Sequence, residues 1–181
     1  MIYPPDMLDI LQSAAVSAWS GTVYRHMFGS HPPARTNTHG ARWNAAGLEA
    51  IYTSCERETA LAEAEYYISM QPLRPRAKRT LYTIRVSLKN VIDLTAPDLL
   101  LRLGITDAIL SGLDHAPCRA IGGAANWLGH DGLLVPSARR RGGTNLVIYQ
   151  QDLSTSDFEV TDEILIADDD RVEAGDLPRH V

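Results

Sequence analysis

Apolar residues recur every three or four positions in several stretches of the chain, and this period is typical of amphipathic helices. The stretches with helical spacing are 6–19, 54–70, 97–103 and 117–128. Pro72 and Pro75 prevent the second helix from continuing. Thr95-Ala-Pro-Asp98 resembles a capping-box start for the third helix.

Other stretches alternate apolar and polar residues or form short apolar runs, which predicts strands. They are 22–26, 50–53, 81–88, 133–135 and 145–149, with one or two more strands around 158–160 and 164–166. Helices and strands are interspersed without regular βαβ alternation. The pattern therefore predicts one α+β domain, a compact mixed sheet with flanking helices.

The predicted helix at 54–70 carries a carboxylate on its apolar side. At about 100° per residue, the face expected to meet solvent holds Glu58, Ala62, Glu65 and Ser69. The opposite face, expected in the core, holds Ala60, Leu61, Ala64, Tyr67 and Ile68. Glu63 projects within the apolar arc and is predicted to point inward. Because a buried carboxylate is costly without a partner, Glu63 has either an internal arginine partner or a functional role.

Composition limits the class of protein. A chain of 181 residues with 45% hydrophobic content is the size of one domain with a real core. The net charge of -5 argues against nucleic-acid binding through a broad basic surface. Cys55 and Cys118 show no CxxC spacing and no signal peptide is recognisable, so a cytoplasmic protein is expected. No apolar run approaches the about 20 residues needed to span a membrane.

Several familiar chemistries have no support in the sequence. There is no P-loop and no strand–GxGxxG–helix unit. The histidines form no HExxH motif, so no metal site is predicted. Cys55 lacks an identifiable base and is interpreted as a structural thiol.

A set of polar residues remains at strand ends and in the loops that follow: Arg25, Arg42, Tyr52, Glu63, Ser137 and Asn145. Each has an ordinary structural explanation when taken alone. Together they suit an anionic, aromatic ligand, because two arginines can bind a pyrophosphate and a tyrosine can stack on a planar base. A carboxylate can stabilise the positive charge that develops on a sugar carbon when a glycosidic bond breaks.

The same residues lie in segments that resemble the RES-domain family, the toxin half of RES–Xre toxin–antitoxin pairs. The segments are Tyr24-Arg25, Gly40-Ala-Arg-Trp-Asn44, Gly47, Ile51-Tyr52-Thr53-Ser54, Glu58-Thr-Ala-Leu-Ala-Glu63, Leu134-Val135-Pro136-Ser137 and Gly143-Thr-Asn145-Leu. The Arg, Glu and Ser that name the family are placed at Arg25 or Arg42, Glu63 and Ser137. The resemblance covers about 24–153. Residues 1–181 are accordingly interpreted as one RES-like domain, with a core at about 22–153 and an acidic C-terminal extension at 154–181.

The resemblance implies a fold similar to ADP-ribosyltransferase toxins and NAD as the substrate, with no metal. The implied reaction is cleavage of the nicotinamide glycosidic bond, which depletes NAD by hydrolysis or phosphorolysis or transfers ADP-ribose to a cellular protein. The implied partner is an Xre-type helix-turn-helix antitoxin that blocks the NAD pocket, with a toxin homodimer inside the larger complex. The toxin itself is not expected to contact nucleic acid.

Roles follow for the candidate residues. Arg25 and Arg42 are expected to hold the NAD phosphates, Tyr52 to stack on or orient the nicotinamide ribose, and Glu63 to stabilise the transition state. Ser137 and Asn145 are expected to position ribose or nicotinamide groups.

Several alternatives stay open. The chain could modify one specific protein as an ADP-ribosyltransferase, or bind a nucleotide or a partner without turnover. Arg35 is an alternative to Arg25 as the family's first arginine. The run Arg139–Arg141 could border the pocket or contact the antitoxin, and solvent exposure is the favoured interpretation for most of it.

Overall fold

The computed structural model describes residues 3–149, 153–154 and 156–166. The helices are α1 Pro5–Ser13, α2 Arg57–Ser69, α3 Pro97–Arg102, α4 Asp107–Ser111 and α5 Ala116–Trp127. The strands are β1 Val16–Phe28, β2 Ile51–Ser54, β3 Arg79–Asp93, β4 Gly132–Pro136, β5 Thr144–Ile148 and β6 Phe158–Leu165. The mixed α+β class is therefore confirmed. Strand β6 lies within the stretch that the sequence assigned to the C-terminal extension.

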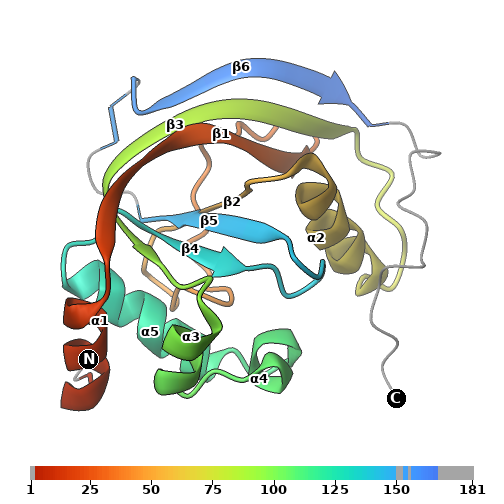
Figure 1. The fold of residues 1–181 in the computed structure, drawn as a ribbon. Coiled ribbons are helices and arrows are strands. Elements are labelled where there is room, and N and C mark those ends of the chain that lie inside the picture. Colours follow the sequence, from red (N-terminus) through yellow and green to blue (C-terminus); the bar gives the residue numbers. More distant parts are fainter. Residues whose placement is uncertain (1–2, 150–152, 155, 167–181) are drawn as a thin grey trace.

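The strands form a six-stranded sheet in the order β1-β2-β5-β4-β3-β6, which closes on itself because β1 also pairs with β3. In Figure 1 the long strands β1 and β3 arch over the short strands β2, β5 and β4, with β6 outermost. Helices α1, α3, α4 and α5 lie beneath the short strands, whereas α2 lies at one end of the sheet. The sheet thus forms an outer and an inner layer, and helices cover the inner one.

Two apolar clusters hold these layers together. One, between the outer and inner strands, contains Val23, Ile51, Ile84, Val86, Leu88, Val91, Leu146 and Ile148. The other joins the inner strands to the helices and includes Leu11, Ile121, Ala124, Leu133, Val135 and Val147. Successive residues of a strand point to opposite faces. Leu146 and Val147 therefore enter different clusters, which explains why β5 is apolar on both sides.

The helix expected at 6–19 is wrong beyond Ser13. Residues from Val16 onward belong to β1, which pairs with β3 from Val16 opposite Ile92 to Phe28 opposite Arg79. Periodicity alone could not separate the two structures here, because the apolar residues of this stretch fit either period. Pairing with a distant strand decided the outcome. Gly21 lies within β1, where a Cβ on this residue would lie 3.1 Å from the Trp19 ring.

The other predicted helices and strands are confirmed with shifted ends, while α4 is an element that the sequence did not predict. Thr106 precedes α4 and accepts a hydrogen bond from Ile109 N at 3.4 Å. The expected capping box before α3 is wrong. The N-cap residue of α3 is Ala96, which has no side chain that can cap the helix, and the Thr95 hydroxyl donates to Asp93 Oδ1 at 2.6 Å instead.

The two faces expected for α2 are partly wrong. Ala62 is buried, whereas Tyr67 is 59% exposed. Glu65, expected in solvent, forms an ion pair with buried Arg79. The helix is covered from more than one side: Ala60 and Leu61 pack with Leu81, and Thr59 lies against Gly143. The sequence pattern assigned only one face of this helix to the core, and this assignment fails because the helix is buried on two sides.

Candidate functional site

The inner strands bring their polar ends together at one edge of the sheet. Both β2 and β4 are antiparallel to β5, so the carboxyl ends of β2 and β4 lie beside the start of β5. Ser54 is paired with Asn145 across the β2–β5 ladder, and Ser137 immediately follows β4. Helix α2 begins just after β2 and carries Glu63 to this edge. The strand register therefore gathers residues that are far apart in the sequence.

Glu63 is held by neutral donors. Its Oε1 accepts a hydrogen bond from Ser137 Oγ at 2.7 Å and another from Asn145 Nδ2 at 2.8 Å. Ser54 Oγ donates to Asn145 Oδ1 at 2.7 Å and so orients the amide. The contacts found among the described residues give Glu63 Oε2 no hydrogen bond and Glu63 no ion pair. The internal Glu–Arg pair considered from the sequence is therefore not what holds this carboxylate.

Ser137 connects the carboxylate to the loop after β4. Its Oγ accepts hydrogen bonds from the backbone N–H groups of Arg139 at 3.1 Å and Arg140 at 3.0 Å. A hydroxyl has one proton and two acceptor lone pairs. With both lone pairs facing these N–H groups, the proton is directed at Glu63. The Ser137 hydroxyl is thus fixed as a donor to the carboxylate.

Arg139 is buried, in contrast to the solvent exposure favoured for most of the run 139–141. The residue is 5% exposed, and its guanidinium carbon lies 3.3 Å from the centre of the Tyr66 ring. The loop turns back through Gly142, with φ of +75°, and Gly143 packs against Thr59. Three successive arginines carry no pattern that shows which one points inward. In contrast, Arg141 is exposed.

Arg42 lies near Arg139, and both guanidinium groups bind backbone carbonyls at the C-terminal end of α4. Arg42 donates from Nη1 and Nη2 to Gly112 O, each at 3.2 Å, and Arg139 donates from Nη1 to Ser111 O at 3.2 Å. Burial lowers the pKa of Arg139; Tyr66 and Glu63 act to raise it and Arg42 acts to lower it. Arg139 therefore lies within electrostatic reach of both Arg42 and Glu63.

Arg25 belongs to a different set of contacts. It donates from Nη2 to Arg35 O at 2.7 Å and from Nη1 to Pro33 O. Burial, together with the positive charge of Arg35, lowers the pKa of Arg25 to about 10. No hydrogen bond or ion pair between described residues joins Arg25 to Glu63. Arg25 thus holds the loop at 29–40, and the structure does not bring it into the Glu63 cluster.

Tyr52 secures the Arg42-Trp43-Asn44 tripeptide. Its hydroxyl accepts from Trp43 N at 2.9 Å and donates to Asn44 Oδ1 at 2.7 Å. Asn44 is fully buried, and its Nδ2 donates to Leu48 O at 2.7 Å. Burial raises the pKa of Tyr52 far above its usual value. The tyrosine is therefore neutral and positions the segment that carries Arg42.

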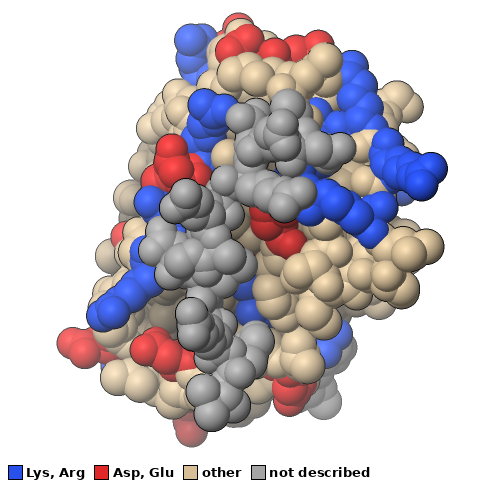
Figure 2. Space-filling model, turned by 90° about the vertical axis from the view of Figure 1, so that its right-hand side faces the viewer, with Lys and Arg blue, Asp and Glu red and all other residues tan. Residues whose placement is uncertain are grey.

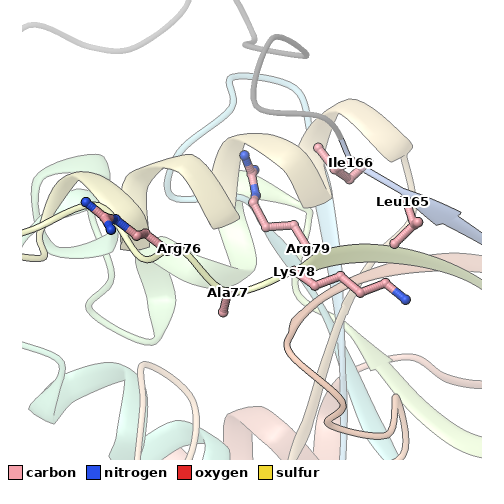
Figure 3. Close-up of a pocket in the computed structure, with 6 residues that line it drawn as sticks. All are labelled: Arg76, Ala77, Lys78, Arg79, Leu165 and Ile166. Carbon is pink, nitrogen blue, oxygen red and sulfur yellow. The ribbon is translucent and has the colours of Figure 1, made fainter.

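Two hollows of the surface lie apart from this cluster. One, of about 230 Å³, is lined by Arg76, Ala77, Lys78, Arg79, Leu165 and Ile166. Figure 3 shows its three cationic side chains pointing in different directions. The other, of about 420 Å³, lies between α3 and α4 and is lined mainly by apolar residues. Neither is lined by Glu63, Ser137 or Asn145, so the candidate site rests on the hydrogen-bonded cluster at the sheet edge.

Surface charge, metal ligands, helix hydrophobicity and the Cys55 thiol each bear on an expectation from the sequence. On the face shown in Figure 2, Lys and Arg side chains are interspersed with Asp and Glu over the part that is coloured by charge. Residues 3–149, 153–154 and 156–166 contain no group of three or more His, Cys, Asp or Glu that could hold a metal ion. In the same part of the chain, no helix has both the length and the apolar character to cross a membrane. Burial raises the pKa of the Cys55 thiol to about 12.

Comparison with known proteins gives a consistent result. The family model described as the RES domain matches residues 17–168. The NAD(+) phosphorylase MbcT of Mycobacterium tuberculosis is 34% identical over 146 residues, which cover 74% of this chain and 75% of that protein; the Mycobacterium bovis protein of the same name gives the same values. The crystal structure of the M. tuberculosis MbcT–MbcA toxin–antitoxin complex contains a chain that aligns with a TM-score of 0.79 and 27% identity, covering 90% of this chain and 93% of that one.

Proposed function

Because this chain belongs to the RES domain family, we propose that it is an NAD-consuming toxin of a toxin–antitoxin pair that cleaves NAD with inorganic phosphate as the acceptor. The resemblance noted in the sequence is confirmed by the family match. The proposal of phosphate over water is supported by the relative's description as an NAD(+) phosphorylase. No comparison favours ADP-ribose transfer to a protein.

The reaction exchanges one bond at the anomeric carbon of the nicotinamide ribose. The carbon–nitrogen bond breaks, and its electron pair leaves on the nicotinamide nitrogen, which becomes neutral. An oxygen of hydrogen phosphate bonds to the same carbon, so the products are nicotinamide and ADP-ribose 1-phosphate. Because the leaving group is a neutral base, positive charge on the sugar in the transition state is the main feature to be stabilised.

Glu63 is the residue proposed to stabilise that charge. Its Oε1 is occupied by Ser137 and Asn145, and this fixes the orientation of the carboxylate. Its Oε2 receives no hydrogen bond from the described residues and is available to face the substrate. A charge that is already oriented needs little reorganisation when the bond breaks. This preorganised carboxylate is the observation that carries the proposal, and Ser137 and Asn145 act by positioning it.

Arg42 and Arg25 are proposed to bind the NAD phosphates. Arg42 is supported by its proximity to Arg139 and by its anchorage through Tyr52. Arg25 is proposed to act through the loop that it holds, because its two terminal nitrogens, Nη1 and Nη2, already donate to Pro33 O and Arg35 O. Tyr52 is proposed to order the Arg42 segment beside the nicotinamide ribose.

The proposed partner is an antitoxin that covers the site, and MbcA in the complex of the related structure supports this pairing. We extend the proposal to an Xre-type helix-turn-helix antitoxin and to a cytoplasmic complex that contains a toxin homodimer. Isolation of the chain together with the product of a neighbouring reading frame tests this. Recovery of the chain without any such partner, with growth unaffected, would contradict it.

The catalytic role is tested with Glu63→Gln, which keeps the shape of the side chain and can still accept hydrogen bonds from Ser137 and Asn145. We expect nicotinamide release from NAD and phosphate to fall at least about 100-fold. The melting temperature should stay within a few degrees of wild type. The control is Glu58→Gln, an exposed position on the same helix, which should leave the rate unchanged.

The acceptor is identified from the products. ADP-ribose 1-phosphate should form only when phosphate is present, and ADP-ribose should dominate if water is the acceptor. Attachment of label from NAD to one polypeptide of a cell extract would indicate a transferase instead. Failure of the wild-type chain to release nicotinamide under all of these conditions would leave only the non-catalytic binding module.

A further inference from the structure

Arg139 is a buried cation without an acidic partner. It is 5% exposed, and the ion pairs between described residues do not include it. Removing a guanidinium from water is costly unless a nearby negative charge offsets the lost hydration. The stack on Tyr66 supplies part of that compensation through the negative face of the ring. Glu63 adds an attraction at longer range, but no carboxylate of the described residues forms an ion pair with Arg139.

A second cation lies beside it. Arg42 is part-buried, binds Gly112 O, and has no ion pair among the described residues. Because Arg139 binds the preceding carbonyl, Ser111 O, the two guanidinium groups are anchored on neighbouring peptide groups. His115 lies in the field of Arg42, Arg119 and Arg139; its pKa is lowered, first by burial and then by these charges, so it stays neutral. Like charges brought together in this way repel one another.

Arg139 retains donors that hydrogen bonds between the described residues do not use. A guanidinium has five N–H groups. The hydrogen bonds to backbone carbonyls engage Nη1 of Arg139 and both Nη atoms of Arg42, and the Arg42 side chain also hydrogen-bonds to Cys118. Among the described residues, Nε and Nη2 of Arg139 take part in no hydrogen bond. Such planar donor groups match the spacing of phosphate oxygens.

We infer that Arg139 and Arg42 form a subsite for a phosphate oxyanion beside Glu63. This inference rests on the proposed function and adds Arg139 to the residues that bind substrate. The ligand chemistry has two sources in the proposed reaction, free inorganic phosphate and the diphosphate of NAD. Its proximity to Glu63 favours free phosphate, because the acceptor must approach the carbon whose charge the carboxylate stabilises.

The test compares Arg139→Gln with Arg141→Gln, an exposed arginine of the same loop that serves as the matched control. Nicotinamide release is measured while phosphate and NAD are varied separately. Arg139→Gln should raise KM for phosphate at least about 10-fold, with KM for NAD within about twofold of wild type. A rise confined to KM for NAD would support the subsite with the NAD diphosphate as its ligand. If neither KM changes, the inference is overturned.

Direct anion binding separates this inference from the proposed reaction. Inorganic phosphate or sulfate should raise the melting temperature of the wild-type chain and of Arg141→Gln but not of Arg139→Gln. Absence of this stabilisation in wild type overturns the subsite even if NAD is cleaved. If the anion stabilises wild type but not Arg139→Gln, the subsite is supported even if no nicotinamide is released. Should the glutamine variant fail to fold, Arg139→Lys keeps the charge over Tyr66 but loses the fork of donors, and should weaken phosphate binding by a smaller factor. Unchanged binding in that variant counts against the subsite.

Discussion

Ser137 shows how a single residue organises the site. Its hydroxyl oxygen accepts hydrogen bonds from two backbone N–H groups of the loop, and the hydroxyl donates its own proton to Glu63. The loop that buries Arg139 is therefore the same loop that orients the carboxylate. A change in the path of this loop should alter both groups together, because both depend on one oxygen atom.

His26 is a second residue whose state is determined by its neighbours. Arg79 Nε donates to His26 Nε2 at 3.0 Å, so that ring nitrogen carries no proton. Burial, and next the positive charge of Arg79, lower the pKa of His26 to about 4, although Glu65 acts in the opposite direction. The histidine is therefore neutral in the folded chain at neutral pH.

This state makes stability depend on pH. The unfolded chain binds a proton at His26 below about pH 6.5, whereas the folded chain does so only below about pH 4. The contribution of His26 to the free energy of unfolding should therefore be complete above pH 6.5. It should decrease as the pH is lowered toward 4, by on the order of 1 kcal/mol per pH unit. Urea unfolding of wild type and His26→Gln across this range measures the difference.

The glutamine variant should show a shallower loss of stability between pH 6.5 and 4 than wild type. His39→Gln is the control, because His39 is exposed. Parallel pH profiles for wild type and His26→Gln would show that His26 contributes nothing to this dependence.

At the scale of elements, α5 approaches the Arg42-Trp43-Asn44 segment through a glycine. Gly122 and Gly123 are both buried within this helix. In the structure, a Cβ on Gly122 would lie 1.8 Å from Trp43 O and 2.6 Å from the Tyr149 hydroxyl. That hydroxyl donates to Trp43 O at 2.9 Å. The glycine thus permits a close contact between the helix and the segment that carries Arg42.

Gly122→Ala should destabilise the chain by at least about 3 kcal/mol, because the backbone of Trp43 has to move. It should also lower the rate of nicotinamide release in whatever fraction stays folded, since Arg42 moves with that backbone. Gly123→Ala is the matched control: its Cβ would meet the end of the Tyr3 side chain, which can swing away. Equal losses of unfolding free energy in the two variants would contradict this explanation.

At the scale of the whole molecule, the site joins two layers of the sheet. Asn145 lies in the inner strand β5 and Ser137 directly follows the inner strand β4, and both hold Glu63. Helix α2 is tied to the outer strand β3 through Glu65 and Arg79. That ion pair has an N–O distance of 2.5 Å, with side chains 3% exposed for Arg79 and 17% for Glu65. The position of the carboxylate therefore depends on how the two layers are connected.

Glu65→Gln should lower the free energy of unfolding by about 2–4 kcal/mol, because it leaves Arg79 buried without a negative charge. Denaturant unfolding measures the loss. The control is Glu159→Gln, which breaks the exposed pair with Arg85 and should cost less than about 1 kcal/mol. A loss in Glu65→Gln no larger than in the control would show that this tie between the layers is weak.

Local pattern was sufficient for much of this protein. Period and turn residues predicted most elements, since an amphipathic helix or strand is encoded in residues that are neighbours in the sequence. The spacing around α2 singled out Glu63 as a carboxylate on an apolar side. The RES-domain resemblance supplied the family and the other candidate residues, which composition could not.

Only the tertiary structure decided which of those residues act together. It placed Ser137 and Asn145 on Glu63, because the register of β2, β4 and β5 is set by pairing between strands far apart in the sequence. Residues from Val16 onward form β1 and not a helix. Tyr67 is exposed and Arg139 is buried. Arg25 binds the loop at 29–40. Burial and hydrogen bonding of a polar side chain depend on every element that packs around it, and no local window of sequence contains that information.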